Sequence, residues 1–228
     1  MADIGFQRGN ALLRRHLEDD RRPSEFGLLD RTWDLLDGVF SPSYTPVTAL
    51  FSSWLPYPEN GSFLEMGSGA GVTAVMAALS GCRAVTAVDI SPASVENTIR
   101  NVERHGVGDR VRVLRSDLFS ALHPDERFDV IYWNSNFAEA PEDFVNATDL
   151  HHAFFDPRYD AHRRFVRQAP AHLADGGRLL LGFSSIGNTG LLADICADAG
   201  MTTSVLRSER RDLDRTVLEF QLLELSST

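Results

Sequence analysis

The sequence has few of the residues that mark disulfide-rich, metal-binding or nucleic-acid-binding proteins. Its 228 residues include two cysteines, Cys82 and Cys196, which stand in no metal or redox spacing, so we expect both to be reduced. Acidic residues outnumber basic ones by 32 to 22, and the formal net charge of −10 argues against a nucleic-acid partner. We also expect no bound metal.

Long hydrophobic runs are absent as well. No stretch is long enough to span a bilayer, and the first residues do not resemble a secretory signal. These absences predict a cytoplasmic protein with no membrane partner, either a monomer or a homodimer. The length suits one domain with a full core. We expect residues 1–45 to form an N-terminal helical lid segment, with helices near 11–17 and 28–36, and residues 46–228 to form the main domain.

Strand and helix patterns alternate from Ser62 onward. The expected strands are 62–66, 83–88, 111–114, 128–133, 178–183, 202–207 and 216–223, and the expected helices are 72–79, 92–104, 161–173 and 189–199. This order predicts an α/β fold with a mostly parallel seven-stranded sheet, helices on both faces and an antiparallel last pair. Ligands bind such sheets at the carboxyl ends of the strands.

A glycine-rich turn follows the first of these strands. Residues 62–71 read Ser-Phe-Leu-Glu-Met-Gly-Ser-Gly-Ala-Gly, so Gly67, Gly69 and Gly71 stand at alternate positions. Glycines here let the backbone turn sharply and approach a ligand closely. The next helix then offers its unpaired N–H groups to that ligand.

Two carboxylates define the expected ligand. Asp89 ends the next strand 20 residues after Gly69, where a βαβ unit places an acid that binds a ribose. Glu65, just before the turn, would repel a pyrophosphate but favour the cationic methionine half of S-adenosylmethionine. The Gly-x-Gly-x-Gly spacing also disfavours a dinucleotide oxidoreductase. A non-catalytic protein that binds S-adenosylmethionine stays open.

Further candidates lie at strand ends and in a long loop. Asp117 and Asn134 end the third and fourth strands, beside the same expected site. The loop at 135–157 is long for a compact domain, which indicates a functional segment. The substrate-pocket candidates, in or near this loop and in the proline-bounded segment before the domain, are His151, His152, Asp156, Tyr159, Tyr44 and Thr45.

Together these motifs resemble class I S-adenosylmethionine-dependent methyltransferases, and most closely the HemK-type glutamine methyltransferases that modify release factors. The matching stretches within residues 42–223 include Phe-Leu-Glu-Met-Gly-Ser-Gly-Ala-Gly, Ala-Val-Asp-Ile-Ser, Arg-Ser-Asp-Leu-Phe and Leu-Ala-Asp-Gly-Gly. The resemblance implies that S-adenosylmethionine is the cofactor. It places Glu65 and Ser68, with the three glycines, around the methionine half of that cofactor. Asp89 and Ile90 would bind its ribose and adenine, and Asp117 and Leu118 would lie at the adenine.

The acceptor motif departs from that family. Asn134-Ser135-Asn136-Phe137 stands where the family has Asn-Pro-Pro-Tyr, whose Asn side chain and next carbonyl hold an amide nitrogen. Asn134 keeps the side-chain acceptor, but the loss of both prolines and of a large N-terminal domain argues against glutamine as the acceptor. We therefore expect methyl transfer to nitrogen on a small molecule, such as a natural-product precursor or amino-acid derivative. Protein glutamine and an RNA base are the alternatives.

Overall fold

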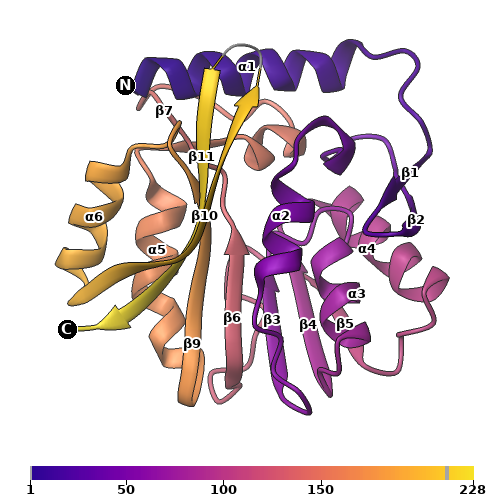
Figure 1. The fold of residues 1–228 in the computed structure, drawn as a ribbon, viewed down its shortest axis with the longest axis vertical. Helices are drawn as coiled ribbons and strands as arrows, with labels where there is room; N and C mark the ends of the chain where they lie inside the picture. The colour runs from indigo at the N-terminus through magenta and orange to yellow at the C-terminus, as the bar shows by residue number, and fades with distance from the viewer. Residues whose placement is uncertain (1, 214–215) are drawn as a thin grey trace.

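A twisted sheet of seven strands forms the centre of the molecule (Figure 1). The computed structural model describes residues 2–213 and 216–228. In spatial order the strands are β10 (Met201–Leu213), β11 (Thr216–Ser227), β9 (Leu173–Ser184), β6 (Phe128–Asn134), β3 (Ser62–Met66), β4 (Ala84–Asp89) and β5 (Val111–Arg115). The pairs from β9 to β5 are parallel, and β11 is antiparallel to both of its neighbours. The predicted fold class is confirmed.

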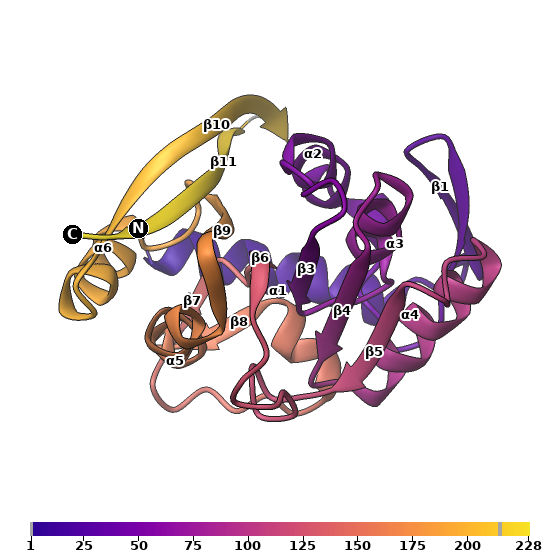
Figure 2. The same ribbon diagram turned by 90° about the horizontal axis from the view of Figure 1, so that it is seen from below.

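Helices cover both faces of this sheet and bury two separate cores (Figure 2). Phe63 and its neighbour Leu64 are both fully buried but belong to different cores, because successive strand residues point to opposite faces. The helices α2 (Val47–Trp54), α3 (Val72–Leu79) and α4 (Pro92–Arg104) contribute to the first core, and α5 (Asp160–Gln168) and α6 (Thr189–Asp198) contribute to the second. The helices expected from the sequence are therefore present on both sides, and a short 3-10 turn, η3 (Ala169–His172), continues α5.

The N-terminal segment is only partly helical. Helix α1 (Ala2–Glu18) is longer than expected, but the helix expected at 28–36 is wrong: a hairpin, β1 (Glu25–Leu28) and β2 (Arg31–Asp34), stands there. Leu29 and Asp30 form its two-residue turn with φ angles of 51° and 57°, which end any helical pattern. Trp33 is fully buried in the first core, so the hairpin is part of the main domain.

Helix α1 crosses above the carboxyl ends of the parallel strands (Figure 1). Its packing needs glycine at two positions, since a Cβ on Gly5 would lie 2.3 Å from the Ile186 carbonyl oxygen and one on Gly9 2.7 Å from the Phe155 ring. His16, also buried, donates from Nδ1 to the Leu12 carbonyl at 2.8 Å and accepts at Nε2 from the Ser41 N–H at 2.9 Å. Burial lowers the pKa of His16 to about 4.

The stretch expected as a loop at 135–157 carries short elements of its own. It contains β7 (Ala138–Ala140), the 3-10 turn η2 (Asp149–Ala153) and β8 (Phe155–Pro157), and β7 pairs with β8 in parallel. The 3-10 turn η1 (Pro42–Tyr44) precedes α2. Phe154 and Phe155 join Leu13 of α1 in a third apolar cluster, which attaches α1 to this stretch. Within the described ranges, no helix combines the length and the apolar character that crossing a membrane requires.

Candidate active site

The glycine turn between β3 and α3 has the conformation that its sequence predicts. Gly67, Gly69 and Gly71 all have positive φ angles, of 67°, 55° and 77°, a region that other residues rarely adopt. A Cβ added to Gly69 would meet no heavy atom within 4 Å, whereas one on Gly71 would lie 2.8 Å from the Thr98 side chain. Gly69 therefore faces open space, and Gly71 permits α3 and α4 to pack closely.

Glu65, the penultimate residue of β3, lies beneath this turn and is 3% exposed. Its Oε2 accepts a hydrogen bond from the Ala74 N–H at 2.8 Å, which satisfies one of the free donors at the start of α3. Burial raises the pKa of the Glu65 carboxyl to about 8, against the hydrogen bonds from Thr73 and Ala74. A cationic group beside this carboxyl would favour its ionised form.

Asp89 at the end of β4 hydrogen-bonds both the glycine turn and the segment that follows β4. Its Oδ2 accepts from the Gly69 N–H at 2.9 Å, and its Oδ1 accepts from the Ser91 N–H at 2.9 Å. Burial raises the pKa of Asp89, although these backbone hydrogen bonds oppose the shift. The carboxylate therefore stands within reach of any group that contacts Gly69.

Asp117 lies beyond the end of β5 and is paired. Its Oδ2 accepts from Arg164 of α5 at 2.7 Å, and the two side chains are 48% and 38% exposed. Leu118, which follows it, has a φ of 50° and is nearly buried. Ile90 is 36% exposed. Asp117 thus keeps its other oxygen for a ligand.

The four residues after Trp133 use their side chains differently. Ser135 Oγ donates to the Gly182 carbonyl at 3.0 Å, and Asn136 Nδ2 donates to the carbonyls of His152 and Phe155 at 3.1 and 2.8 Å. Both side chains thus bond the surrounding backbone. Asn134, by contrast, makes no side-chain hydrogen bond within residues 2–213 and 216–228, and it is half-buried. Because Met66 is opposite Trp133 in the sheet register, Asn134 and Gly67 leave adjacent strand ends.

One cavity of about 590 Å³ connects these groups. It reaches from the ends of β3, β4, β5 and β6 to α1, to η1 and to the β10–β11 hairpin. The expected site residues that line it are Tyr44, Thr45, Glu65, Gly67, Ser68, Gly69, Asp89, Ile90, Asp117, Leu118, Asn134, Ser135, Asn136, Phe137 and His152. Its volume is in the range of a site for a small ligand.

Four expected site residues, Gly71, His151, Asp156 and Tyr159, do not line this cavity. Gly71 packs on α4, as described above. Tyr159 is fully buried, where its hydroxyl donates to the Phe137 carbonyl and accepts from the Asn188 N–H at 2.8 Å. His151 hydrogen-bonds Thr148 at the start of η2. Asp156 also has a structural contact, accepting from buried His162 at 2.6 Å. These side chains support the walls of the cavity rather than forming them.

The sequence predicted an N-terminal lid segment but named none of the α1 residues that line the cavity. Arg8, Ala11, Leu12 and Arg15 line the cavity, and their spacing places them on one helix face. The Arg15 guanidinium lies 4.2 Å from the centre of the Tyr44 ring. The i, i+3, i+4, i+7 spacing was available as a signal, but two arginines on it resemble a solvated face.

The antiparallel β10–β11 pair was predicted, but its contribution to the cavity wall was not. Leu213, Leu218 and Phe220 line the cavity from β10 and β11, together with Ile186. Nothing in the spacing of these apolar residues separates a cavity wall from an ordinary core position.

The sequence between the hairpin turn and α6 decides the family. Residues 32–189 match the family model described as "Methyltransferase small domain". The chain belongs to this family. The match covers well over half of the chain and includes every strand end described above. It confirms the predicted resemblance to class I methyltransferases and the predicted enzyme class.

Individual relatives of this methyltransferase act on large substrates. A release factor glutamine methyltransferase of Rhodopirellula baltica is 35% identical over 131 residues, covering 53% of this chain and 44% of the relative. A ribosomal protein uL3 glutamine methyltransferase of Bradyrhizobium diazoefficiens is 36% identical over 124 residues, covering 51% of this chain and 39% of the relative. The chain thus spans less than half the length of these two curated relatives.

A solved structure shares the fold. The 16S rRNA N2 G1207 methyltransferase of T. thermophilus, in complex with AdoMet and guanosine, superimposes with a TM-score of 0.66 and 22% identity, covering 91% of this chain and 50% of the other. These comparisons correct one expectation. A small-molecule acceptor, with no macromolecular partner, is wrong for this methyltransferase, because its curated relatives are named for protein acceptors.

Proposed function

We propose that this methyltransferase transfers a methyl group from S-adenosylmethionine to a side-chain amide nitrogen of a protein of the translation machinery. The observation that carries the proposal is the free Asn134 side chain at the end of β6, next to the glycine turn. The names of the curated relatives support a protein glutamine acceptor. A cytoplasmic location is consistent with such a substrate.

The residues present fit the cofactor. Open space faces Gly69, and the Glu65 carboxyl lies at the base of the turn. The Asp89 carboxylate accepts a hydrogen bond from the Gly69 N–H. Gly67, Ser68 and Gly69 would hold the methionine half with Glu65 near its ammonium group, and Asp89 would bind the ribose hydroxyls. Asp117 and Leu118 would lie at the adenine. The bound cofactor supplies an electrophilic methyl group on sulfur.

Asn134 would orient the acceptor. Its Oδ1 can accept one N–H of a primary amide, and the Ser135 backbone carbonyl can accept the other. Holding both N–H groups fixes the plane of the amide, so that its nitrogen faces the methyl group in line. The nitrogen would form a bond to the methyl carbon while the methyl–sulfur bond breaks and its electron pair stays on sulfur. The methylated nitrogen would then lose one N–H proton to solvent. Phe137 would form an apolar wall that excludes water.

We also propose that α1 acts as the lid of this site. Arg8 and Arg15 lie on its cavity-facing side, and Gly5 and Gly9 hold it tightly against Ile186 and Phe155. The lid is a shorter segment than residues 1–45, because Trp33 belongs to the first core. We therefore assign the lid to α1 and assign the hairpin and η1 to the main domain.

Incubation with S-adenosylmethionine carrying a labelled methyl group tests the function. Purified bacterial release factor, uL3 protein and intact ribosomes would be offered separately, and tandem mass spectrometry would locate the methyl group. We expect label on a glutamine side chain of a protein. Label found only in ribosomal RNA, or in none of these acceptors, would overturn the proposal.

A further inference from the structure

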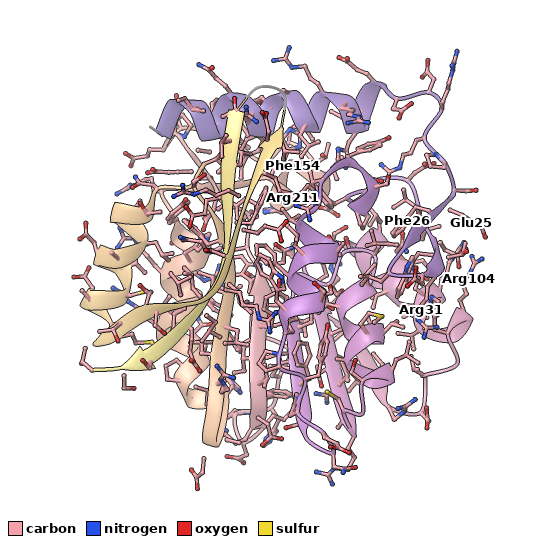
Figure 3. All side chains as sticks on the ribbon, viewed as in Figure 1. Glu25, Phe26, Arg31, Arg104, Phe154 and Arg211 are labelled. Carbon is pink, nitrogen blue, oxygen red and sulfur yellow. The ribbon has the colours of Figure 1, made fainter. Side chains whose placement is uncertain are left out.

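A second depression lies directly beside the cavity. We call it the side groove: about 580 Å³, lined by Leu28 and Leu29 of the hairpin, Pro46 and Leu50 at α2, and Arg211 of β10. It is open and largely apolar. Figure 3 labels Arg211 on the β10–β11 hairpin, on the side near α2.

The side groove adjoins the cavity along two walls. Pro42, Tyr44 and Thr45 of the η1 segment line both. On the opposite wall, Arg211 lines the groove while Leu213, two residues along the same strand, lines the cavity. Residues two apart on a strand share a face and stand about 7 Å apart. The groove therefore borders the cavity at η1 and the β10–β11 hairpin.

The cavity is too small for a folded acceptor. With the cofactor in place, about 590 Å³ leaves room for one acceptor side chain, so the chain that flanks it must bind outside. The side groove is the surface that adjoins the cavity through shared residues. Leu28, Leu29 and Leu50 in its lining can contact the side chains of an extended segment.

Leu29 supplies an independent observation. It stands in the hairpin turn at a φ of 51°, where asparagine, aspartate or glycine is usual and a bulky apolar residue is strained. Its side chain is only half-buried and lines the side groove. Leu29 packs against the first core on one side, and the rest of its side chain stays exposed in the groove, where a partner can contact it.

Resting on the proposed function, we propose that the side groove binds the polypeptide segment next to the methylated residue, with an acidic side chain of that segment facing Arg211. Arg211 is paired with Glu209 at 2.7 Å, but both side chains are more than 40% exposed. Exposed pairs of this kind contribute little to stability, so Arg211 is available to an incoming carboxylate.

Two variants with matched controls test the groove. Leu29→Asp introduces a residue that the turn favours but removes contacts with the first core, so its affinity for S-adenosylhomocysteine serves as the check that it is folded. Val205→Asp introduces the same charge at a 53% exposed position on β10 that lines neither depression. Arg211→Glu reverses the groove charge, and Arg207→Glu does so at an exposed position of the same strand outside it. The readouts are KM and kcat for the protein acceptor, and calorimetric affinity for S-adenosylhomocysteine.

We expect Leu29→Asp and Arg211→Glu to raise the acceptor KM by about tenfold or more, with cofactor affinity and kcat within about twofold of wild type. Both controls should keep the wild-type KM. An unchanged KM in the two groove variants, with protein methylated normally, would overturn the groove and leave the proposed function intact. Failure of the wild-type enzyme to methylate any protein would instead overturn both.

Discussion

The two ends of the cavity are built in different ways. The end proposed to hold the cofactor, called the cofactor end, comes from strand ends that are neighbours in the sheet, and backbone-bound carboxylates such as Asp89 fix its geometry. The acceptor end comes from segments distant in sequence: α1, η1, the 135–157 stretch and the β10–β11 hairpin. The first end is therefore rigid and local, whereas the second depends on how separate segments pack.

This difference suggests how such a fold changes substrate while keeping its cofactor. Hydrogen bonds from Gly69 and Ser91 to Asp89 constrain the cofactor end, so few changes there are tolerated. At the acceptor end, Leu213 and Ile186 contact the cavity mainly through apolar surface, which tolerates substitution if volume is kept. Variants at the two ends should accordingly affect different kinetic constants.

The largest effect is expected at Asn134, on the boundary between the two ends. Asn134→Ala should lower turnover by about 100-fold or more, because the lost hydrogen bond orients the amide in the transition state. Affinity for S-adenosylhomocysteine, measured by calorimetry, should stay near wild type. The neighbouring Ser135→Ala is the control, since that hydroxyl bonds the Gly182 carbonyl instead. Turnover close to wild type in Asn134→Ala would remove Asn134 from the mechanism.

The next effect is expected within the cofactor end. Asp89→Ala removes a charged acceptor that also holds Gly69 and Ser91, so cofactor affinity should fall by about 10- to 100-fold. Asp117→Ala should cost less, because Asp117 is half-exposed and already paired with Arg164. Calorimetry on both variants checks the order. Equal losses would show that the two carboxylates contribute alike.

The same contrast explains what could be predicted from the sequence. Strand ends and the glycine turn are readable because each depends on a few consecutive residues, as Gly67 and Gly69 show with their positive φ angles. The cavity walls at Arg15, Leu218 and Ile186 depend on contacts between distant segments, which periodicity does not report. The segment around Leu29 was predicted as a helix because its leucines fit a helical spacing. It forms a hairpin instead, and burial of Trp33 in the first core stabilises that hairpin.

A pH experiment tests the buried carboxyl at the cofactor end. Since the pKa of Glu65 is about 8 in the folded protein and near 4.5 when unfolded, the folded state holds one more proton between these values. Its contribution to stability is complete below about pH 4.5 and is lost as the pH rises through 8. Between pH 6 and 7 this amounts to about 1.4 kcal/mol of unfolding free energy.

Glu65→Gln isolates this contribution. The variant cannot ionise, so its urea-derived unfolding free energy should fall less between pH 6 and 7 than that of wild type, by about 1.4 kcal/mol. Cofactor binding should weaken at the same time, because the carboxylate that meets the ammonium group is gone. Parallel pH profiles for the two proteins would show that Glu65 is ionised throughout in the folded state.

The smallest effect is expected at α1, where the lid proposal can be tested by a substitution that changes no charge in the cavity. A Cβ on Gly9 would meet the Phe155 ring at 2.7 Å, so Gly9→Val should push α1 away from the 135–157 stretch. Valine also favours a helix over glycine, so α1 itself should persist. Gln7→Val, at an exposed position of α1 outside the cavity lining, controls for the β-branched residue.

We expect Gly9→Val to release S-adenosylhomocysteine about fivefold faster in stopped-flow measurements, the effect of losing roughly 1 kcal/mol of lid contact. Amide exchange in residues 2–18 should accelerate, while exchange in β3 and β4 stays at the wild-type rate, because α1 undocks without unfolding the sheet. Gln7→Val should change neither quantity. Faster exchange in α1 with an unchanged release rate would mean that α1 packs over the cavity but does not retain the cofactor. The packing of α1 would then affect only the acceptor end of the cavity.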